Sequence, residues 1–210
     1  LGQVASGEQL RKAGDQVQIV WFKRDLRVVD HEALFNAARS GPVLPLYILE
    51  PELWRQPDMS HRHYAFLCEC LHELDRALAA LGQSLIIRVG DAVSVLQSLH
   101  EAHNFTALWS HQETWNDWTY KRDLRVLSWL SDHQVVWHEP RQFGVIRRLK
   151  NRNGWAASWA QHMRRPILPA PKHLKPIATE SDALPSAHRL GLEPDGAKQR
   201  QTGGRARGLR

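Results

Sequence analysis

The chain has 210 residues with an ordinary apolar content, which allows one sizeable domain, or one domain and part of a second. No run approaches the ~20 apolar residues of a membrane-spanning helix, and the two cysteines, Cys68 and Cys70, are too few for a zinc or iron–sulfur site. The net charge of +6 is uneven, because residues 1–140 contain 13 Lys and Arg against 18 Asp and Glu, whereas residues 141–210 contain 15 against 4. We therefore expect a cytoplasmic protein without membrane or metal partners, and a boundary near Pro140.

The chain begins with a polar stretch, residues 1–16, which we expect to be a disordered leader. Residues 17–22 form a short apolar, β-branched and aromatic run, which is typical of a buried strand in a parallel sheet. A charged turn follows, and Asp30 is expected to cap a helix that Gly41 ends.

The same alternation continues to residue 137. Residues 43–49 predict a second strand, in spite of Pro45, and residues 50–59 a loop. A long amphipathic helix is expected between Ser60 and Gly82. Further strands are expected at residues 84–89, 106–110 and 134–137, separated by helices.

Five strands alternating with four helices predict an α/β fold, a Rossmann-like doubly wound parallel sheet in the order 3-2-1-4-5. Strands 1 and 4 are then neighbours, and the loops after them face each other across one crevice. These loops are residues 23–27 (KRDLR) and 111–116 (HQETWN). Their convergence predicts a ligand site, while an equally good interpretation is a structural ion-pair cluster of Arg24, Asp25, Arg27 and Asp123.

The chain changes character near residue 141. Residues 141–177 place Trp155 and Trp159 at helical spacing before a proline-rich stretch, which predicts a basic, mostly irregular linker with one short helix. Residues 178–210 are polar and glycine-rich, and we expect them to be disordered. The expected organisation is therefore a leader (1–16), an α/β domain (17–140), a linker (141–177) and a C-terminal part (178–210).

Several stretches resemble one family. IVWFKRDLRVVDHEAL resembles the N-terminal signature WFRRDLRxxDNxAL of the DNA photolyase/cryptochrome family, with Lys23 for the first Arg and His31-Glu32 where Asn-Pro is common. HQETWNDWTYKRD is similar to HEETGNxWxYxRD of bacterial members, with Gln112 and Trp115 in place of Glu and Gly. GVIRRLKNRNGWAASWAQHM resembles the segment that leads out of the N-terminal domain. GLEPDGAKQRQTGGRARGL resembles the GGxxAxxL stretch that opens the family's helical flavin domain.

The resemblance implies that residues 17–140 are the light-harvesting (antenna) domain of a deoxyribodipyrimidine photolyase, with a folate, deazaflavin or FMN chromophore. The implied chromophore-binding residues, none of them catalytic, are Phe22, Lys23, Arg24, Asp25, Leu26, Arg27, His111, Gln112, Glu113 and Asn116. In the family, a following helical domain binds FAD and damaged DNA and acts as a lyase that splits pyrimidine dimers in light. We expect residues 178–210 to be only the truncated start of that domain, so that the chain is a fragment that docks to it and has no repair activity of its own.

Two alternatives stay open at this point. One is a fragment of a cryptochrome-type blue-light receptor. The other is a basic nucleic-acid-binding α/β module, in which cations contact phosphates and Trp155 and Trp159 stack on bases. Those cations are Arg147, Arg148, Lys150, Arg152, Arg164 and Arg165.

Overall fold

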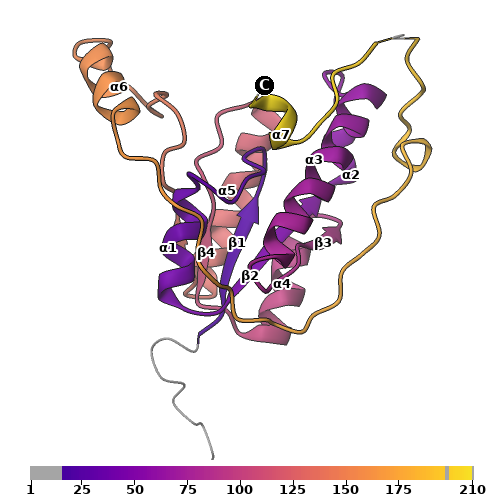
Figure 1. Ribbon diagram of the computed structural model, residues 1–210, viewed down its shortest axis with the longest axis horizontal. Helices are drawn as coiled ribbons and strands as arrows, with labels where there is room; N and C mark the ends of the chain where they lie inside the picture. The colour runs from indigo at the N-terminus through magenta and orange to yellow at the C-terminus, as the bar shows by residue number, and fades with distance from the viewer. Residues whose placement is uncertain (1–15, 197–198, 210) are drawn as a thin grey trace, which may run out of the picture.

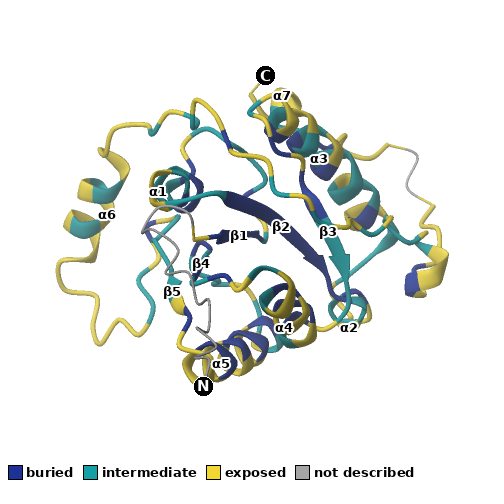
Figure 2. Cartoon of the chain, turned by 90° about the horizontal axis from the view of Figure 1, so that it is seen from below, coloured by how far each residue is buried: buried dark blue, intermediate teal, exposed yellow. Residues whose placement is uncertain are grey.

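The computed structural model describes residues 16–196 and 199–209, so the predicted leader lies outside the described residues except for Gln16. One sheet contains five strands, β1 (Gln18–Phe22), β2 (Val43–Leu49), β3 (Ile86–Val89), β4 (Ala107–Trp109) and β5 (Val136–His138). All neighbouring strands are parallel, and their order is β3-β2-β1-β4-β5 (Figures 1 and 2). The predicted fold class and strand order are confirmed.

Helices cover both faces of the sheet (Figure 2). They are α1 (Glu32–Ser40) and α3 (His61–Ala79) on one face, and α4 (Ala92–His103) and α5 (Asp117–Asp132) on the other. Strand β1 is buried along its whole length, and its side chains alternate between the two cores. Ile19 and Trp21 pack toward α4 and α5, whereas Val20 and Phe22 pack toward α1 and α3. A strand between two helical layers therefore has a continuous apolar sequence, which explains the run at residues 17–22.

Pro45 does lie within β2, opposite Val20 of β1. The pairing of β2 with β3 begins only at Leu46, so Pro45 has a neighbouring strand on one side alone. This position tolerates a residue without an N–H group. The residues after β2, predicted as a loop, contain a short helix, α2 (Pro51–Trp54), with proline at its first position.

The expected cap of helix α1 is wrong by one residue. His31 is the N-cap, and its Nδ1 accepts a 3.0 Å hydrogen bond from Leu34 N. Asp30 instead has a left-handed backbone with φ of 54°, and its Oδ1 accepts a 3.3 Å bond from Leu168 N. The carboxylate of Asp30 thus binds the backbone at Leu168, 138 residues away in the chain. The sequence around Asp30 gives no sign of this partner. Gly41 ends the helix as expected.

After β5 the chain is mostly irregular and contains α6 (Trp155–Met163), the 3-10 helix η1 (His188–Leu190) and α7 (Arg205–Gly208). It runs along the edge strand β3, where the Ser181 hydroxyl and the Asp182 carboxylate accept hydrogen bonds from Ile87 N and Val89 N. These bonds cover an otherwise unpaired sheet edge. Leu190 and Leu192 are buried in the core on the α3 side.

The proposed division into residues 1–16, 17–140, 141–177 and 178–210 stays a prediction. Among the described residues, no helix is both long enough and apolar enough to cross a membrane.

Candidate functional site

The loops after β1 and β4 lie against each other at the carboxyl edge of the sheet, as the strand order predicted. Arg24 Nη2 lies 3.3 Å from Glu113 Oε1, and Lys23 Nζ donates a 3.1 Å hydrogen bond to Asp123 Oδ2 on α5. His111 Nδ1, from the loop after β4, also shares a hydrogen bond with Asp25 Oδ2, from the loop after β1. Charged side chains from β1, β4 and α5 therefore meet at one place.

A cavity of about 670 Å³, which we call the main cavity, opens beside these loops. Its apolar wall comes from β1, β2, α2, α3 and the loops, and consists of Trp21, Phe22, Leu26, Tyr47, Ile48, Leu53, Trp54, Met59, Phe66, Leu67 and Trp115. Its polar groups are Lys23, Arg24, Arg27, Glu50, Asp58, His63, Cys70, Glu113, Thr119, Arg122, Gly204 and Arg205. A largely apolar cavity of this size with convergent polar groups suits a small organic ligand.

Only part of the predicted site lines the main cavity. Phe22, Lys23, Arg24, Leu26, Arg27 and Glu113 do so. Asp25, His111 and Gln112 instead line a separate small cavity. Asn116 lines neither, because its side chain caps α5 by accepting from Thr119 N at 3.0 Å and donates to Asp58 at 3.3 Å. The main cavity is thus displaced from the predicted crevice toward β2 and α3.

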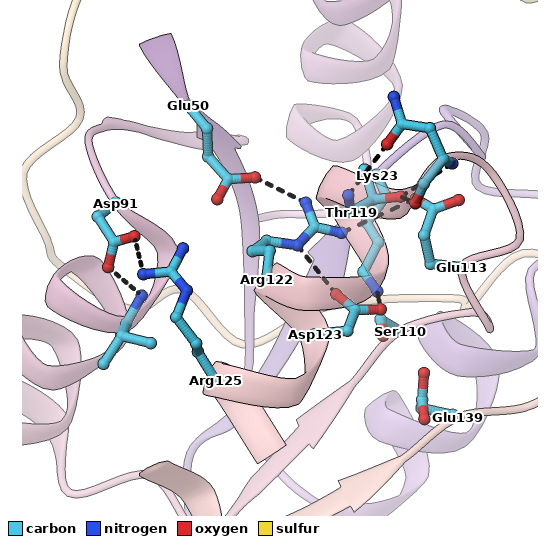
Figure 3. Close-up of polar contacts among 12 residues, drawn as sticks. Lys23, Glu50, Asp91, Ser110, Glu113, Thr119, Arg122, Asp123, Arg125 and Glu139 are labelled. Carbon is cyan, nitrogen blue, oxygen red and sulfur yellow. Dashed lines mark hydrogen bonds and ion pairs between the residues drawn. The ribbon is translucent and has the colours of Figure 1, made fainter. Parts of the chain in front are cut away.

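A buried ionic network borders the main cavity (Figure 3). Arg122 donates to Glu50 Oε2 at 2.6 Å and to Asp123 Oδ1 at 2.9 Å, and its Nη2 lies 3.8 Å from Glu113 Oε2. Burial opposes the charge of this guanidinium, but Glu50 and Asp123 outweigh burial and raise the pKa of Arg122. Burial raises the pKa of Glu50, against the effect of Arg122. The Arg122 guanidinium therefore contacts the carboxylates of Glu50, Asp123 and Glu113.

The ring of Trp21 lies between two of these cations. Lys23 Nζ and the Arg122 guanidinium carbon are each 4.6 Å from its ring centroid, within the range of cation–π attraction. Burial lowers the pKa of Lys23; Asp123 opposes this shift, and Arg122 adds to it to a smaller extent. Two buried atoms of the network, Glu50 Oε1 and Arg122 Nη2, have no hydrogen-bond partner among the described residues.

Asp25, His31 and His111 form a second buried cluster, which is the group of described residues with potential metal-ligand spacing. Burial disfavours the Asp25 charge, but His31 and His111 outweigh burial and hold the pKa of Asp25 well below its usual range. Burial lowers the pKa of His31. Because His31 Nδ1 accepts the Leu34 N–H group, the neutral ring carries its proton on Nε2, which lies 2.9 Å from Asp25 Oδ2. A protonated nitrogen cannot ligate a metal, so this geometry favours a structural cluster.

The four residues of the predicted structural ion-pair cluster therefore fall into two groups, the two aspartates and the two arginines. Asp25 and Asp123 are buried in structural clusters. Arg24 is 45% exposed, and its guanidinium lies 5.2 Å from the Trp115 ring centroid. Arg27 donates to the Asp30 carbonyl at 2.8 Å. These two arginines remain available to a ligand in the main cavity.

The part of the site that comes from β2 and α5 was not predicted from the sequence. Glu50 follows directly after β2, so the strand-end rule that located the other loops applies to it as well. Arg122 belongs to the WTYKRD stretch that carries the family resemblance. Nothing local signalled Gly204 and Arg205, which reach the cavity because their segment packs on α3.

Comparison with known proteins shows which family this chain is similar to. The sequence profile described as DNA photolyase matches residues 18–147. A cryptochrome DASH, chloroplastic/mitochondrial, from Solanum lycopersicum is 35% identical over 116 residues, which is 52% of this chain and 20% of that protein. The chain thus spans about a fifth of the length of this curated relative.

Solved structures show the same fold. A cryptochrome from Synechocystis sp. PCC6803 has a TM-score of 0.75 at 19% identity, over 95% of this chain and 46% of that one. An archaeal photolyase from Sulfolobus tokodaii, solved with two FAD molecules, has a TM-score of 0.70 at 21% identity, over 92% of this chain and 45% of that one. The profile match covers more than half of the chain and includes both loops of the sheet edge. This chain belongs to the DNA photolyase family.

Proposed function

We propose that residues 17–140 are the light-harvesting antenna domain of a deoxyribodipyrimidine photolyase-like protein, and that a planar chromophore binds in the main cavity. The observation that carries this proposal is the cavity itself, about 670 Å³ of largely apolar space at the carboxyl ends of β1 and β2, beside the loop after β4. Open α/β sheets bind ligands in crevices at the carboxyl ends of their strands. For the Sulfolobus tokodaii photolyase, the two FAD molecules imply a novel light-harvesting cofactor.

The residues present fit a flat heterocycle. Trp54, Tyr47 and Phe66 offer aromatic surfaces, and Leu67 offers an aliphatic one. Burial raises the pKa of Tyr47, so its hydroxyl stays protonated and can donate a hydrogen bond to a ring carbonyl. Glu50 and Glu113 offer acceptors for ring N–H groups. When bound, the chromophore would supply absorption of light, and the protein would hold it and exclude water.

The cations at the cavity would bind an anionic tail. Arg24, Arg27 and Arg205 all line it. Arg24 pairs with Glu113 of the buried network at 3.3 Å, but its side chain is 45% exposed. Folate, deazaflavin and FMN chromophores can each present a carboxylate or phosphate group. The choice among the three is therefore left to experiment.

On the same proposal, the domain serves light-driven repair of pyrimidine dimers. Damaged DNA and catalytic FAD would bind the helical domain of the complete protein, to which this domain docks. In a cryptochrome-type receptor, the alternative identity of the complete protein, the chromophore would bind in the same cavity.

The test is retention of chromophore by the purified chain. Incubate it with folate, deazaflavin or FMN, remove free ligand by gel filtration, and record near-ultraviolet and visible absorption. At least one chromophore should co-elute with an altered spectrum. Leu67→Trp, which fills the cavity, should abolish retention, whereas Leu124→Trp on the exposed side of α5 should not. Failure of all three chromophores, or equal retention by both variants, would show that the main cavity is not an antenna site.

A further inference from the structure

A second cavity, which we call the η1 cavity, has a volume of about 460 Å³ and lies beside the 3-10 helix η1. One of its walls is formed by residues 54–56 and Met59, from α2 and the loop after it. The opposite wall is formed by residues 188–192. Trp54 and Met59 also line the main cavity, whereas the other residues of the two walls take no part in it.

The wall formed by residues 188–192 is anchored to the α/β domain. Leu190 and Leu192 are buried in the core on the α3 side. Just before this wall, the Tyr64 hydroxyl on α3 donates a 2.5 Å hydrogen bond to the Pro185 carbonyl. Both walls of the η1 cavity therefore have a defined position, and a ligand does not have to order a loop when it binds.

The titratable groups that line the η1 cavity are all basic. They are Arg55, His188 and Arg189, and no Asp or Glu among the described residues lines it. The exposed Arg189 guanidinium has no hydrogen-bond or ion-pair partner in the described part of the chain. Arg55 pairs with Glu52, but the two side chains are 60% and 67% exposed, so this pair is weak. The η1 cavity thus offers one unpaired and one weakly paired guanidinium to an anion.

The wall on the α2 side contains a buried donor that lacks an acceptor. Trp54 is 4% exposed, and its Nε1 atom has no hydrogen-bond partner among the described residues. Nearly all buried polar groups in proteins are hydrogen-bonded, so an unpaired one calls for a further partner. An acceptor bound in the η1 cavity can complete the hydrogen bonding of this indole.

The chemistry of the two walls indicates the class of ligand. A phosphomonoester has a charge of about −1.5 to −2 at pH 7 and three acceptor oxygens, which matches two guanidinium groups better than a single carboxylate does. Arginine binds phosphate through paired N–H groups. The volume of the cavity suits a small organic molecule, and Trp54 and Met59 offer apolar contact for its organic part.

We propose that the η1 cavity binds a small organic phosphate. The phosphate group accepts hydrogen bonds from Arg189, Arg55 and His188, and the organic group lies against Trp54 and Met59. Since the three basic residues lie outside the main cavity, the proposal does not depend on chromophore binding.

The first test uses phenyl phosphate, titrated into the isotopically labelled full chain and followed by NMR. The indole N–H signal of Trp54, assigned by its absence in Trp54→Phe, should shift and reach saturation. Arg189→Gln should weaken the affinity about tenfold, because hydrogen bonds between charged groups are lost. Arg189 has no partner in the described part of the chain, so this variant should keep the fold. The matched control is Arg76→Gln in the last turn of α3, which should bind as the wild type does.

The second test separates the phosphate group and the η1 cavity from other sources of affinity. Phenol and benzoate, which present no charge and one negative charge, should each bind at least about tenfold more weakly than phenyl phosphate. Leu67→Trp, which fills the main cavity, should still bind phenyl phosphate. Benzoate binding as tight as phenyl phosphate binding, loss of binding in Leu67→Trp, a Trp54 signal that does not shift, or wild-type affinity in Arg189→Gln would each overturn the proposal.

Discussion

The Arg122 guanidinium donates a 2.6 Å hydrogen bond to the Glu50 carboxylate and thereby joins α5 to the carboxyl end of β2 at the wall of the main cavity. The two side chains are 4% and 3% exposed. Removing one partner of a buried ion pair leaves the other charge without compensation. The first prediction concerns this relationship.

Arg122→Ala is expected to lower the free energy of unfolding by about 3–5 kcal/mol, because buried Glu50 would lose its cation and Asp123 would keep only Lys23. Urea denaturation followed by circular dichroism measures this change. The matched control is Arg125→Ala on the same helix, whose pair with Asp91 is exposed and is expected to contribute less than about 1 kcal/mol. Equal effects of the two substitutions would contradict a structural role for the buried network.

A second prediction concerns pH. The folded-state pKa of His31 lies below its ordinary value of 6.5, so between these two values the unfolded chain binds more protons than the folded chain. Stability from this residue is therefore intact above about pH 6.5 and falls on acidification, by at most about 1.4 kcal/mol per pH unit. The pKa of Asp25 is lowered as well, so its contribution is lost only at much lower pH.

His31→Asn removes the titrating group, and the asparagine side chain can still cap α1. The loss of stability just below pH 6.5 should therefore be smaller in this variant than in the wild type, measured by urea denaturation at several pH values. His61→Asn, at the half-buried first position of α3 and outside this cluster, should keep the wild-type pH dependence. An identical slope in both variants would refute the role assigned to His31.

A third prediction tests how the C-terminal segment is held on α3. Gly203 N donates to Glu69 Oε2 at 2.6 Å, and a Cβ atom on Gly203 would lie 2.3 Å from the Phe66 carbonyl oxygen. Hydrogen bonds from Arg200 and then from Gly203 lower the pKa of Glu69 to about 2. Gly203→Ala should detach the segment and raise the pKa of Glu69 toward its usual value.

Carboxyl chemical shifts of Glu69 followed by NMR against pH measure that change. The control is Gly208→Ala, because no atom lies within 4 Å of a Cβ built on Gly208. If the Glu69 pKa stays low in the Gly203 variant, close packing of glycine on α3 does not hold the segment.

A fourth prediction concerns Trp115, which stands where bacterial members of the family have glycine in the matching stretch. Its ring lines the main cavity beside Arg24 and is 36% exposed. If the ring is a wall of the chromophore site, Trp115→Ala should weaken chromophore binding about tenfold, since stacking contacts are worth about 0.5–1.5 kcal/mol and the apolar contact area adds to this. Fluorescence titration measures the affinity, with Tyr120→Ala as the control. Stronger binding after Trp115→Ala would mean that the ring blocks the cavity.

The sheet and the meeting of two polar loops at its carboxyl edge could be predicted from the sequence because they depend on local patterns. The apolar run at residues 17–22 and the polar loops after β1 and β4 reflect the burial of each strand and the direction of the chain. The position of the cavity could not be predicted in this way, because Glu50 and Arg122 come together only in three dimensions, at a sequence separation of 72 residues. The predicted cap at Asp30 was wrong for the same reason, since the partner of Asp30 is Leu168.

Binding of a chromophore in the main cavity is tested most directly by the position of that chromophore in a complex. A crystal structure of the chain with the chromophore that it retains should show the ring between Leu67 and Trp115, with its anionic tail near Arg24 or Arg205. A ring bound elsewhere, for example on Trp155 and Trp159 of helix α6, with the main cavity left to solvent, would contradict the proposed antenna site.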